Sequence, residues 1–207
     1  MLFIELLENL HKYLNSKGHS SLEGNCSQIM QQMNHLFDIT LSYGNNAPIH
    51  ILEIGFNAGH SALTFLQNPM AHVTSIDIGA HYYVLDGKTF IDTLYPGRHT
   101  LVIGDSRHVL PSIQNTYDII FIDGAHDYET VKKDLETCLK MCHKDTIIIM
   151  DDVIPLSMEV YDWAVGPSRV WWEARSNNLV DQMGKSQYGN GRGMVWGKKL
   201  NGAKGAP

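Results

Sequence analysis

Residues 49–59, IHILEIGFNAG, join a short apolar run to a turn that contains two glycines. The run is rich in β-branched residues and nearly continuous, which is typical of a strand buried on both faces of a parallel sheet. Glu53, Gly55 and Gly59 give the spacing acid-x-Gly-x-x-x-Gly, and glycine lets the backbone approach a ligand closely. The stretch therefore predicts a strand that ends in a ligand-binding turn and leads into a helix.

Four further runs of this kind follow, separated by polar segments that have the length and character of helices. They are HVTSID at 72–77, TLVIGD at 100–105, YDIIFID at 117–123 and DTIIIMDD at 145–152. Parallel strands need crossover connections of this kind, and such crossovers are right-handed. We predict an α/β fold, a Rossmann-like doubly wound sheet that is mostly parallel, with its ligand site at the carboxyl ends of the strands.

The flanking segments extend this core. The helical spacing of apolar residues predicts amino-terminal helices over 2–14 and 27–41. After Val153 we expect a helix near 158–164, a strand near 169–174, a glycine-rich connection and an antiparallel last strand near 194–198. We predict a single domain over 1–207, with a helical leader at 1–45, the Rossmann-like core at 46–200 and a flexible tail at 201–207.

The composition limits the classes of function. The formal net charge of −6 is spread over 207 residues without a basic block, so the electrostatic footprint of a nucleic-acid-binding protein is missing. No uninterrupted apolar run approaches the length needed to span a bilayer. We expect a soluble, cytoplasmic protein that binds a small-molecule acceptor and neither nucleic acid nor membrane, with a homodimer left open.

Acidic residues after the next two strands extend the predicted site. Asp77 ends the second strand, about twenty residues after the glycine turn, where a carboxylate would accept both hydroxyls of an adenosine ribose. Asp105 and Ser106 follow the third strand and are placed to meet an adenine edge. Phe56 and Asn57 stand where a dinucleotide fingerprint requires its second glycine, so a pyrophosphate cofactor is disfavoured.

The motifs EIGFNAG, SID and GDS, in this order, resemble the first three motifs of class I S-adenosylmethionine-dependent methyltransferases, and the resemblance covers residues 49–153. It implies S-adenosylmethionine as the cofactor, with its methionine part at the glycine turn, its ribose at the second strand and its adenine at the third. The donor-binding candidates are Glu53, Gly55, Asn57, Gly59, Asp77, Asp105, Ser106 and Asp123.

A second group of candidates follows the fourth and fifth strands. These strands are neighbours in a doubly wound sheet, which brings Asp123, Asp151 and Asp152 to the same edge. Converging carboxylates repel one another unless a positive charge lies among them, and oxygen ligands suit Mg²⁺ or another hard divalent cation. We favour a metal site over the alternative that Asp123 only terminates a strand.

This group resembles the metal-dependent small-molecule O-methyltransferases of the catechol and antibiotic-sugar types. Their metal ligands map onto Asp123, Asp151 and Asp152, although the catechol type has asparagine at the last position. Their general base, three residues after the first ligand, is lysine in the catechol type and histidine in some sugar-modifying members. Here that residue is His126, and histidine titrates close to neutral pH, so His126 is the predicted catalytic base.

The leading hypothesis is a metal-assisted O-methyltransferase that acts on a small hydroxylated molecule, a catechol-like ring or a sugar diol. Three alternatives stay open. One is a metal-independent methyltransferase acting on nitrogen or on a peptide. Another is a nicotinamide-dependent oxidoreductase, against which the interrupted glycine pattern argues. The last is a donor-binding module without turnover.

Residues outside these motifs are candidates for the rest of the site. The aromatic candidates for the acceptor pocket are Trp163, Trp171, Trp172, Tyr188 and Trp196. Packing in the core is an equally good interpretation of each tryptophan. Tyr188 and Arg192 are assigned to the glycine-rich connection and are the better candidates for contacting the acceptor. Glu23, which precedes the second helix, is a candidate to close over the donor.

Overall fold

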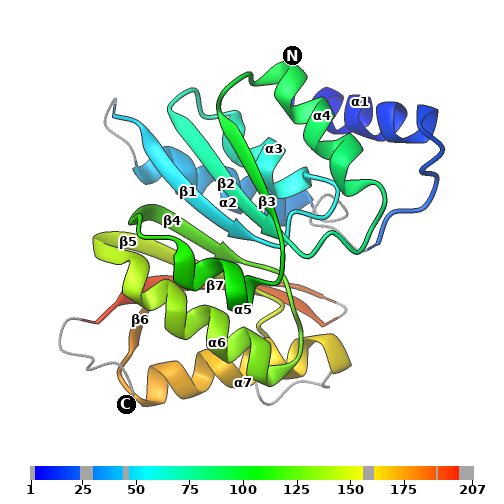
Figure 1. Cartoon of the computed structure of the whole chain (residues 1–207). Coiled ribbons are helices and arrows are strands. Elements are labelled where there is room, and N and C mark those ends of the chain that lie inside the picture. Colours follow the sequence, from blue (N-terminus) through cyan, green and yellow to red (C-terminus); the bar gives the residue numbers. More distant parts are fainter. Residues whose placement is uncertain (1–2, 24–29, 44–46, 156–160, 190, 201–207) are drawn as a thin grey trace.

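The computed structural model describes residues 3–23, 30–43, 47–155, 161–189 and 191–200. Its strands are β1 (Ile49–Ile54), β2 (Ala71–Asp77), β3 (His99–Ile103), β4 (Tyr117–Ile122), β5 (Cys142–Asp151), β6 (Val180–Gly189) and β7 (Arg192–Lys199). They form a seven-stranded sheet in the order β3-β2-β1-β4-β5-β7-β6 (Figure 1). The first five strands pair in parallel, β7 pairs antiparallel with β5, and β6 pairs antiparallel with β7. The predicted fold class and the antiparallel last strand are confirmed.

Helices cover both faces of the sheet (Figure 1). One layer holds α1 (Phe3–Ser16), α2 (Met30–Tyr43), α3 (His60–Leu66) and α4 (Val84–Leu94). The other holds α5 (Ser106–Val109), α6 (Tyr128–Cys138) and α7 (Asp162–Ser176), with the short 3-10 turns Leu110–Ser112 and Leu139–Met141. In the described part of the chain, no helix has the length and apolarity required to cross a bilayer.

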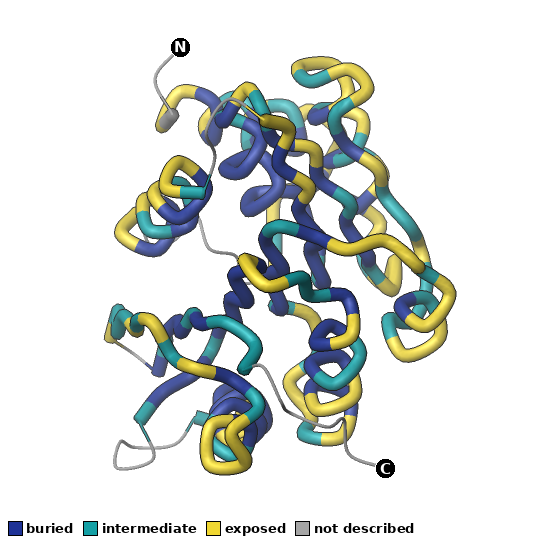
Figure 2. The backbone as a smooth tube through the Cα atoms, turned by 90° about the vertical axis from the view of Figure 1, so that its left-hand side faces the viewer, coloured by how far each residue is buried: buried dark blue, intermediate teal, exposed yellow. Residues whose placement is uncertain are grey.

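Alternation along the strands divides the interior into two cores. On β1, Ile51 belongs to the core beneath α1–α4, whereas Leu52 belongs to the core beneath α5–α7, as the two-residue period of a strand requires. Leu10 of α1 and Met33 of α2 are fully buried in the first core. Figure 2 shows how buried positions gather along the strands and the inner faces of the helices. The helical leader is thus packed onto the sheet as part of its core.

The predicted strand at 169–174 is wrong, because these residues lie within α7. Val170, Trp171 and Trp172 favour a strand by propensity, and glycine and proline, here Gly166 and Pro167, are unfavourable inside a helix. The helix forms because its buried residues recur at helical spacing against the sheet, with Trp171 fully buried. Residues 158–160 of the helix expected nearby lie outside the described residues.

The glycine-rich connection is also more ordered than expected, since most of it forms the β6–β7 hairpin. Tyr188 and Arg192 therefore lie on strands and not on a loop. A Cβ atom on Gly184 would lie 2.2 Å from the ring of Trp196, so this glycine makes room for an indole across the hairpin. Gly191 takes a left-handed φ of 74° in the turn. The predicted tail, 201–207, lies outside the described residues.

The order of the strands fixes where a ligand site is expected. The chain leaves β1 toward β2 and β3 on one side and later returns to place β4 and β5 on the other. The crevice of a doubly wound sheet lies at this reversal, outside the carboxyl ends of β1 and β4.

Candidate active site

Two adjacent pockets open at this reversal. The pocket lined by the three predicted metal ligands is called the acidic pocket and has a volume of about 450 Å³. The second pocket has a volume of about 300 Å³. They share the lining residues Glu23, Gly55, Asn57, Asp123 and Gly124. Together the two pockets form one crevice that crosses the glycine turn.

The glycine turn after β1 has a left-handed backbone at three positions and packs on the turn after β4. Gly55, Asn57 and Gly59 have left-handed φ values of 94°, 53° and 91°. A Cβ atom on Gly55 would lie only 2.0 Å from the carbonyl oxygen of Asp123. Asparagine visits this backbone region more readily than most residues do. The turn therefore has the shape that the sequence predicted, and its position depends on backbone contact.

Asp77 fastens the end of β2 to this turn. Its Oδ2 accepts hydrogen bonds from the backbone N–H groups of Phe56 and Asn57, at 3.0 and 2.8 Å, and its Oδ1 accepts one from Gly79 at 2.7 Å. Asp77 also lines the second pocket. A carboxylate has about four acceptor positions, so the assignment of ribose to Asp77 stays a prediction that is compatible with these contacts.

Asp105 and Ser106 line the second pocket. Asp105 caps α5 by accepting a hydrogen bond from the backbone N–H of Arg107 at 2.9 Å. The Arg107 guanidinium also donates to both of its carboxylate oxygens, which lowers the pKa of Asp105 to about 2. Arg107 also lines the pocket and is not among the site residues predicted from the sequence.

Glu53 lies behind the crevice and lines neither pocket. Its side chain is fully buried and accepts hydrogen bonds from the hydroxyls of Ser61, at 2.5 Å, and of Ser75. Burial raises its pKa to about 7, although both hydroxyls oppose the shift. Ser61 lines the acidic pocket and was missed. Its place in the first turn of a helix that follows a glycine turn is a signal that would have found it.

The three predicted metal ligands meet at the acidic pocket. Asp123 follows β4, Asp151 ends β5, and Asp152 comes next in the chain. Consecutive residues of a strand point to opposite faces. Asp152 has a left-handed φ of 55°, and this turn of the backbone brings both aspartates to the same pocket.

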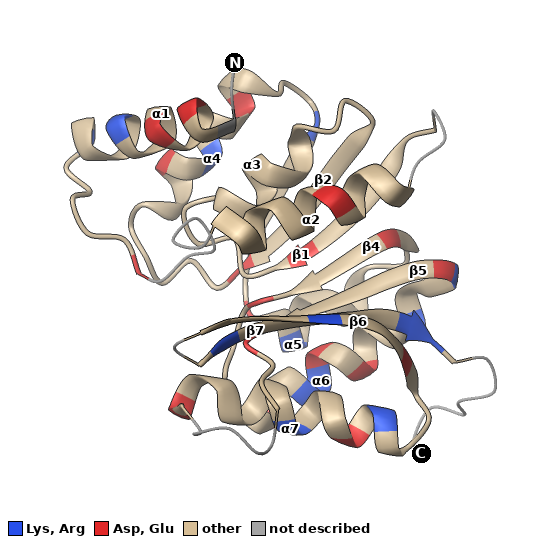
Figure 3. Ribbon diagram, turned by 180° about the vertical axis from the view of Figure 1, so that it is seen from behind, with Lys and Arg blue, Asp and Glu red and all other residues tan. Residues whose placement is uncertain are grey.

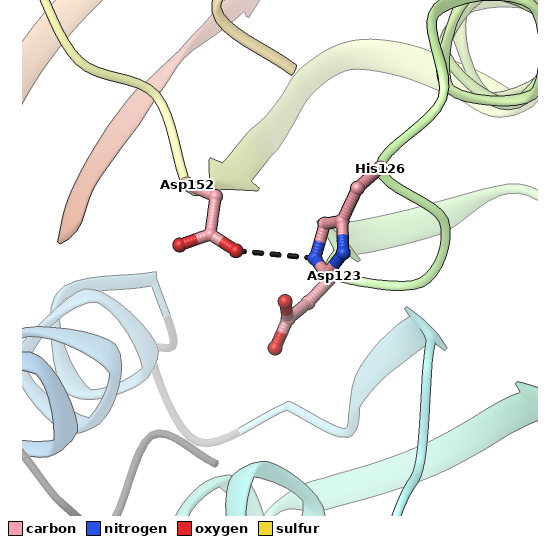
Figure 4. A group of neighbouring side chains, drawn as sticks. All are labelled: Asp123, His126 and Asp152. Carbon is pink, nitrogen blue, oxygen red and sulfur yellow. Dashed lines mark ion pairs between the residues drawn. The ribbon is translucent and has the colours of Figure 1, made fainter. Parts of the chain in front are cut away.

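Within this group, Asp123, His126 and Asp152 each offer a ligand atom, and these atoms lie within 4.8 Å of one another (Figure 4). His126 Nε2 lies 3.2 Å from Asp152 Oδ2. Asp151 is not one of these three residues, and its Oδ2 accepts a hydrogen bond of 2.5 Å from Nε2 of Gln32 on α2. No local sequence pattern points to Gln32, which is one of many polar residues on that helix.

The electrostatics of the cluster favour a cation. Desolvation and the charge of Asp151 raise the pKa of Asp123 well above its ordinary value. Desolvation and the neighbouring Asp152 raise the pKa of Asp151 to about 7. The hydrogen bond to Asp152 raises the pKa of His126. Carboxylates packed this closely form a donor set that fits a hard divalent cation.

The remaining walls contain few of the predicted aromatic residues. Trp163 lines the acidic pocket and is 40% exposed, and Arg192 lies nearby at the start of β7. The other four aromatic candidates line neither pocket. The indole of Trp171 donates a hydrogen bond to Gln182, and that of Trp172 donates one to the carbonyl of Ile154. Tyr188 is hydrogen-bonded to His35, and Trp196 packs against Gly184 and His35.

Glu23 lies at both pockets, as its proposed place over the donor requires. Its carboxylate pairs with His81, and its backbone N–H donates to the hydroxyl of Tyr83 at 3.2 Å. The rings of His81 and Tyr83 stack with centroids 4.9 Å apart. The segment before α2 is thereby attached to the segment that leads into α4.

Substitution of Gly55 tests the backbone contact between the two turns. In Gly55→Ala the new methyl group collides with the Asp123 carbonyl, so we expect a loss of about 3 kcal/mol or more in the free energy of unfolding. Gly97→Ala is the control, since Gly97 also has a positive φ, of 74°, but has open space around it. The control isolates backbone strain of about 1 kcal/mol. Equal losses in urea unfolding of the two variants would contradict this account.

Glu53 gives a prediction for the pH dependence of stability. Its folded pKa of about 7 exceeds its ordinary value of 4.5, so the folded state retains a proton that the unfolded state releases. Stability therefore falls as the pH rises between these values, by about 3 kcal/mol from this residue. Glu53→Gln should flatten that part of the profile in urea unfolding. Glu8→Gln, at an exposed position on α1, should not, and a slope unchanged by Glu53→Gln refutes the prediction.

Residues 52–153, which include the glycine turn, Asp77 and the acidic cluster, match a family model described as a methyltransferase domain. No curated protein sequence matches the chain significantly.

Similar solved structures include an O-methyltransferase from Bacillus cereus in complex with SAH (TM-score 0.70, 18% identity). An SAH-bound methyltransferase from Podospora anserina (0.69, 15%) and the O-methyltransferase TomG from Streptomyces achromogenes in complex with SAM (0.71, 14%) are also similar. They cover 94%, 96% and 95% of this chain, and 91%, 88% and 90% of their own chains, in that order. The matched domain and this fold identify the chain as a class I S-adenosylmethionine-dependent methyltransferase that resembles the small-molecule O-methyltransferases.

Proposed function

We propose that this enzyme is a divalent-metal-assisted O-methyltransferase that acts on a small hydroxylated molecule, a catechol-like ring or a sugar diol. One observation carries the proposal. Donor atoms of Asp123, His126 and Asp152 lie within 4.8 Å of one another, in a pocket that adjoins the one lined by Asp77 and Asp105.

The crevice suits S-adenosylmethionine. Asp77 would hold the ribose, and Asp105 with Ser106 the adenine, since all three line the second pocket. Gly55 and Asn57 are common to both pockets, so the methionine part would cross the glycine turn toward the acidic pocket. The bound donor supplies a methyl group for in-line displacement with a neutral leaving group, and the enzyme must provide an aligned, deprotonated nucleophile.

The acidic pocket would provide that nucleophile. Asp123 and Asp152, with Asp151 beside them, would hold Mg²⁺ or another hard divalent cation. The chemistry that such a cation would supply is a lowered pKa of an acceptor hydroxyl held beside it. Vicinal oxygens chelate a cation, which is the reason for proposing catechols and diols.

His126 is the proposed general base. With its Nε2–H donating to Asp152, the Nδ1 lone pair is left to accept the proton of the acceptor hydroxyl. Asp152 then orients the ring and stabilises the imidazolium that forms, as the acidic member of a catalytic triad does. The imidazole is about half exposed, with 47% of its side chain accessible, so a substrate can reach it.

Substitutions of Asp152 test the metal site. Asparagine and glycine both tolerate the left-handed backbone at this position. Asp152→Asn keeps an oxygen ligand for the cation but loses the negative charge beside His126, so it should lose activity, although less than Asp152→Gly, which should lose about 100-fold or more. The measurement is transfer of labelled methyl groups to a panel of catechols and diols, with Mg²⁺ or with excess chelator, alongside calorimetric titration with S-adenosylhomocysteine.

Donor affinity should stay unchanged in both variants, because Asp152 lies outside the second pocket. Full turnover in excess chelator would contradict the proposal and favour a metal-independent enzyme that methylates nitrogen or a peptide.

Replacement of His126 tests the base. His126→Ala should lower kcat by about 10²- to 10⁴-fold with little change in KM. His126→Lys should regain part of the rate and shift the pH–rate profile upward, since lysine has a higher ordinary pKa, of about 10.4. His72→Ala, at an exposed position on β2, is the control. A pH–rate profile that is identical in the lysine variant and the wild type would exclude His126 as the base.

A further inference from the structure

We propose that Gln32, on the leader helix α2, is a positioning residue of the cation site and acts by holding the carboxylate of Asp151. This inference rests on the proposed function. The Gln32 side chain is 1% exposed and donates from Nε2 to Asp151 Oδ2 at 2.5 Å, across 119 residues of sequence. Asp151 is itself 9% exposed and lines the acidic pocket.

The chemistry of the amide suits this task. Asp151 lies beside Asp152, and two neighbouring carboxylates repel each other, so an unrestrained Asp151 side chain would turn away from the cluster. A hydrogen bond to one oxygen prevents that movement and leaves the other oxygen for a cation or for a water molecule on it. The amide donor is neutral. An arginine or lysine in its place would cancel the negative charge that attracts the cation.

The helix that carries Gln32 is fixed on both sides. On the α3 side, Met33 accepts a hydrogen bond from Thr64 at 3.5 Å, and the carbonyl of Thr40 accepts one from Asn68 at 3.2 Å. On the β6 side, His35 is hydrogen-bonded to the hydroxyl of Tyr188 at 3.0 Å. Because α2 cannot shift easily, the amide has a fixed position relative to β5. This rigidity distinguishes a positioning contact from a chance surface hydrogen bond.

The contact also connects the leader to the acidic pocket. Asp123, His126 and Asp152 come from the carboxyl ends of the core strands, where the fold itself places them. Asp151 is the member of the acidic group that a residue outside the core holds. The leader therefore completes the cation site as well as the hydrophobic core.

The test is the binding of Mn²⁺ alone, measured as the loss of the free-ion signal in electron paramagnetic resonance. Gln32→Met removes the donor and keeps a similar volume on the helix. We expect its Mn²⁺ affinity to fall by about 10- to 100-fold, the usual effect of losing a residue that supports a metal ligand. Gln31→Met, the adjacent exposed glutamine on the same helix, should bind Mn²⁺ as the wild type does. Affinity for S-adenosylhomocysteine should be unchanged in both variants.

A double-mutant cycle with Asp151→Asn shows whether the effect passes through Asp151. Gln32→Met should add no further loss of Mn²⁺ affinity in that background. A further loss there, or Mn²⁺ affinity of Gln32→Met within about two-fold of the wild type, overturns the role of Gln32 and leaves the proposed function standing. Absence of Mn²⁺ binding by the wild type overturns both. If Gln32→Met does not fold, Gln32→Ser, which cannot span the distance, carries the same expectation.

Discussion

The backbone contact between Gly55 and Asp123 sets the geometry on which the rest of the site depends. These residues follow adjacent parallel strands, and only the missing Cβ of Gly55 lets the two turns meet. The turn after β1 lines the second pocket, and the turn after β4 carries Asp123 of the acidic pocket. The contact between the turns therefore fixes the distance between the two pockets. Methyl transfer needs reacting atoms aligned within about 3–3.5 Å, and a rigid backbone contact is an effective way to hold that alignment.

The same arrangement concentrates negative charge at the sheet edge (Figure 3). Each carboxylate is accommodated differently: Glu53 by two serine hydroxyls, Asp151 by the amide of Gln32, and Asp152 by His126. The raised pKa values of Glu53 and Asp151 show that these donors do not fully offset desolvation. Asp152, a member of the cluster, has a left-handed backbone. Functional sites often retain backbone strain and unfavourable charge, and both lower the stability of the folded protein.

The sequence predicts the parallel core well and its surroundings less well, for physical reasons. Strands buried on both faces leave continuous apolar runs, which are local signals, and the strand order then places Asp77 and Asp123 without further information. The strand predicted around Trp171 was wrong, because tertiary packing of the helix outweighed the β propensity of its residues. Gln32 could not be found, because a hydrogen bond between residues 119 positions apart leaves no local pattern. Glu53 was expected in the pocket, but strand alternation directs it behind the crevice, toward Ser61.

The proposed function assigns the choice of acceptor to the walls of the acidic pocket and not to the sheet. The solved O-methyltransferase structures cover at least nine-tenths of this chain at 18% identity or less, so fold is retained while side chains change. The walls here include residues away from the ends of the parallel strands: Glu23 after α1, Trp163 at the start of α7 and Arg192 at the start of β7. If the proposed function holds, an aromatic ring and a guanidinium in the same pocket as an acidic cluster would discriminate among acceptors by shape and charge. The strand ends would then supply the chemistry, and these three positions the selection of the acceptor.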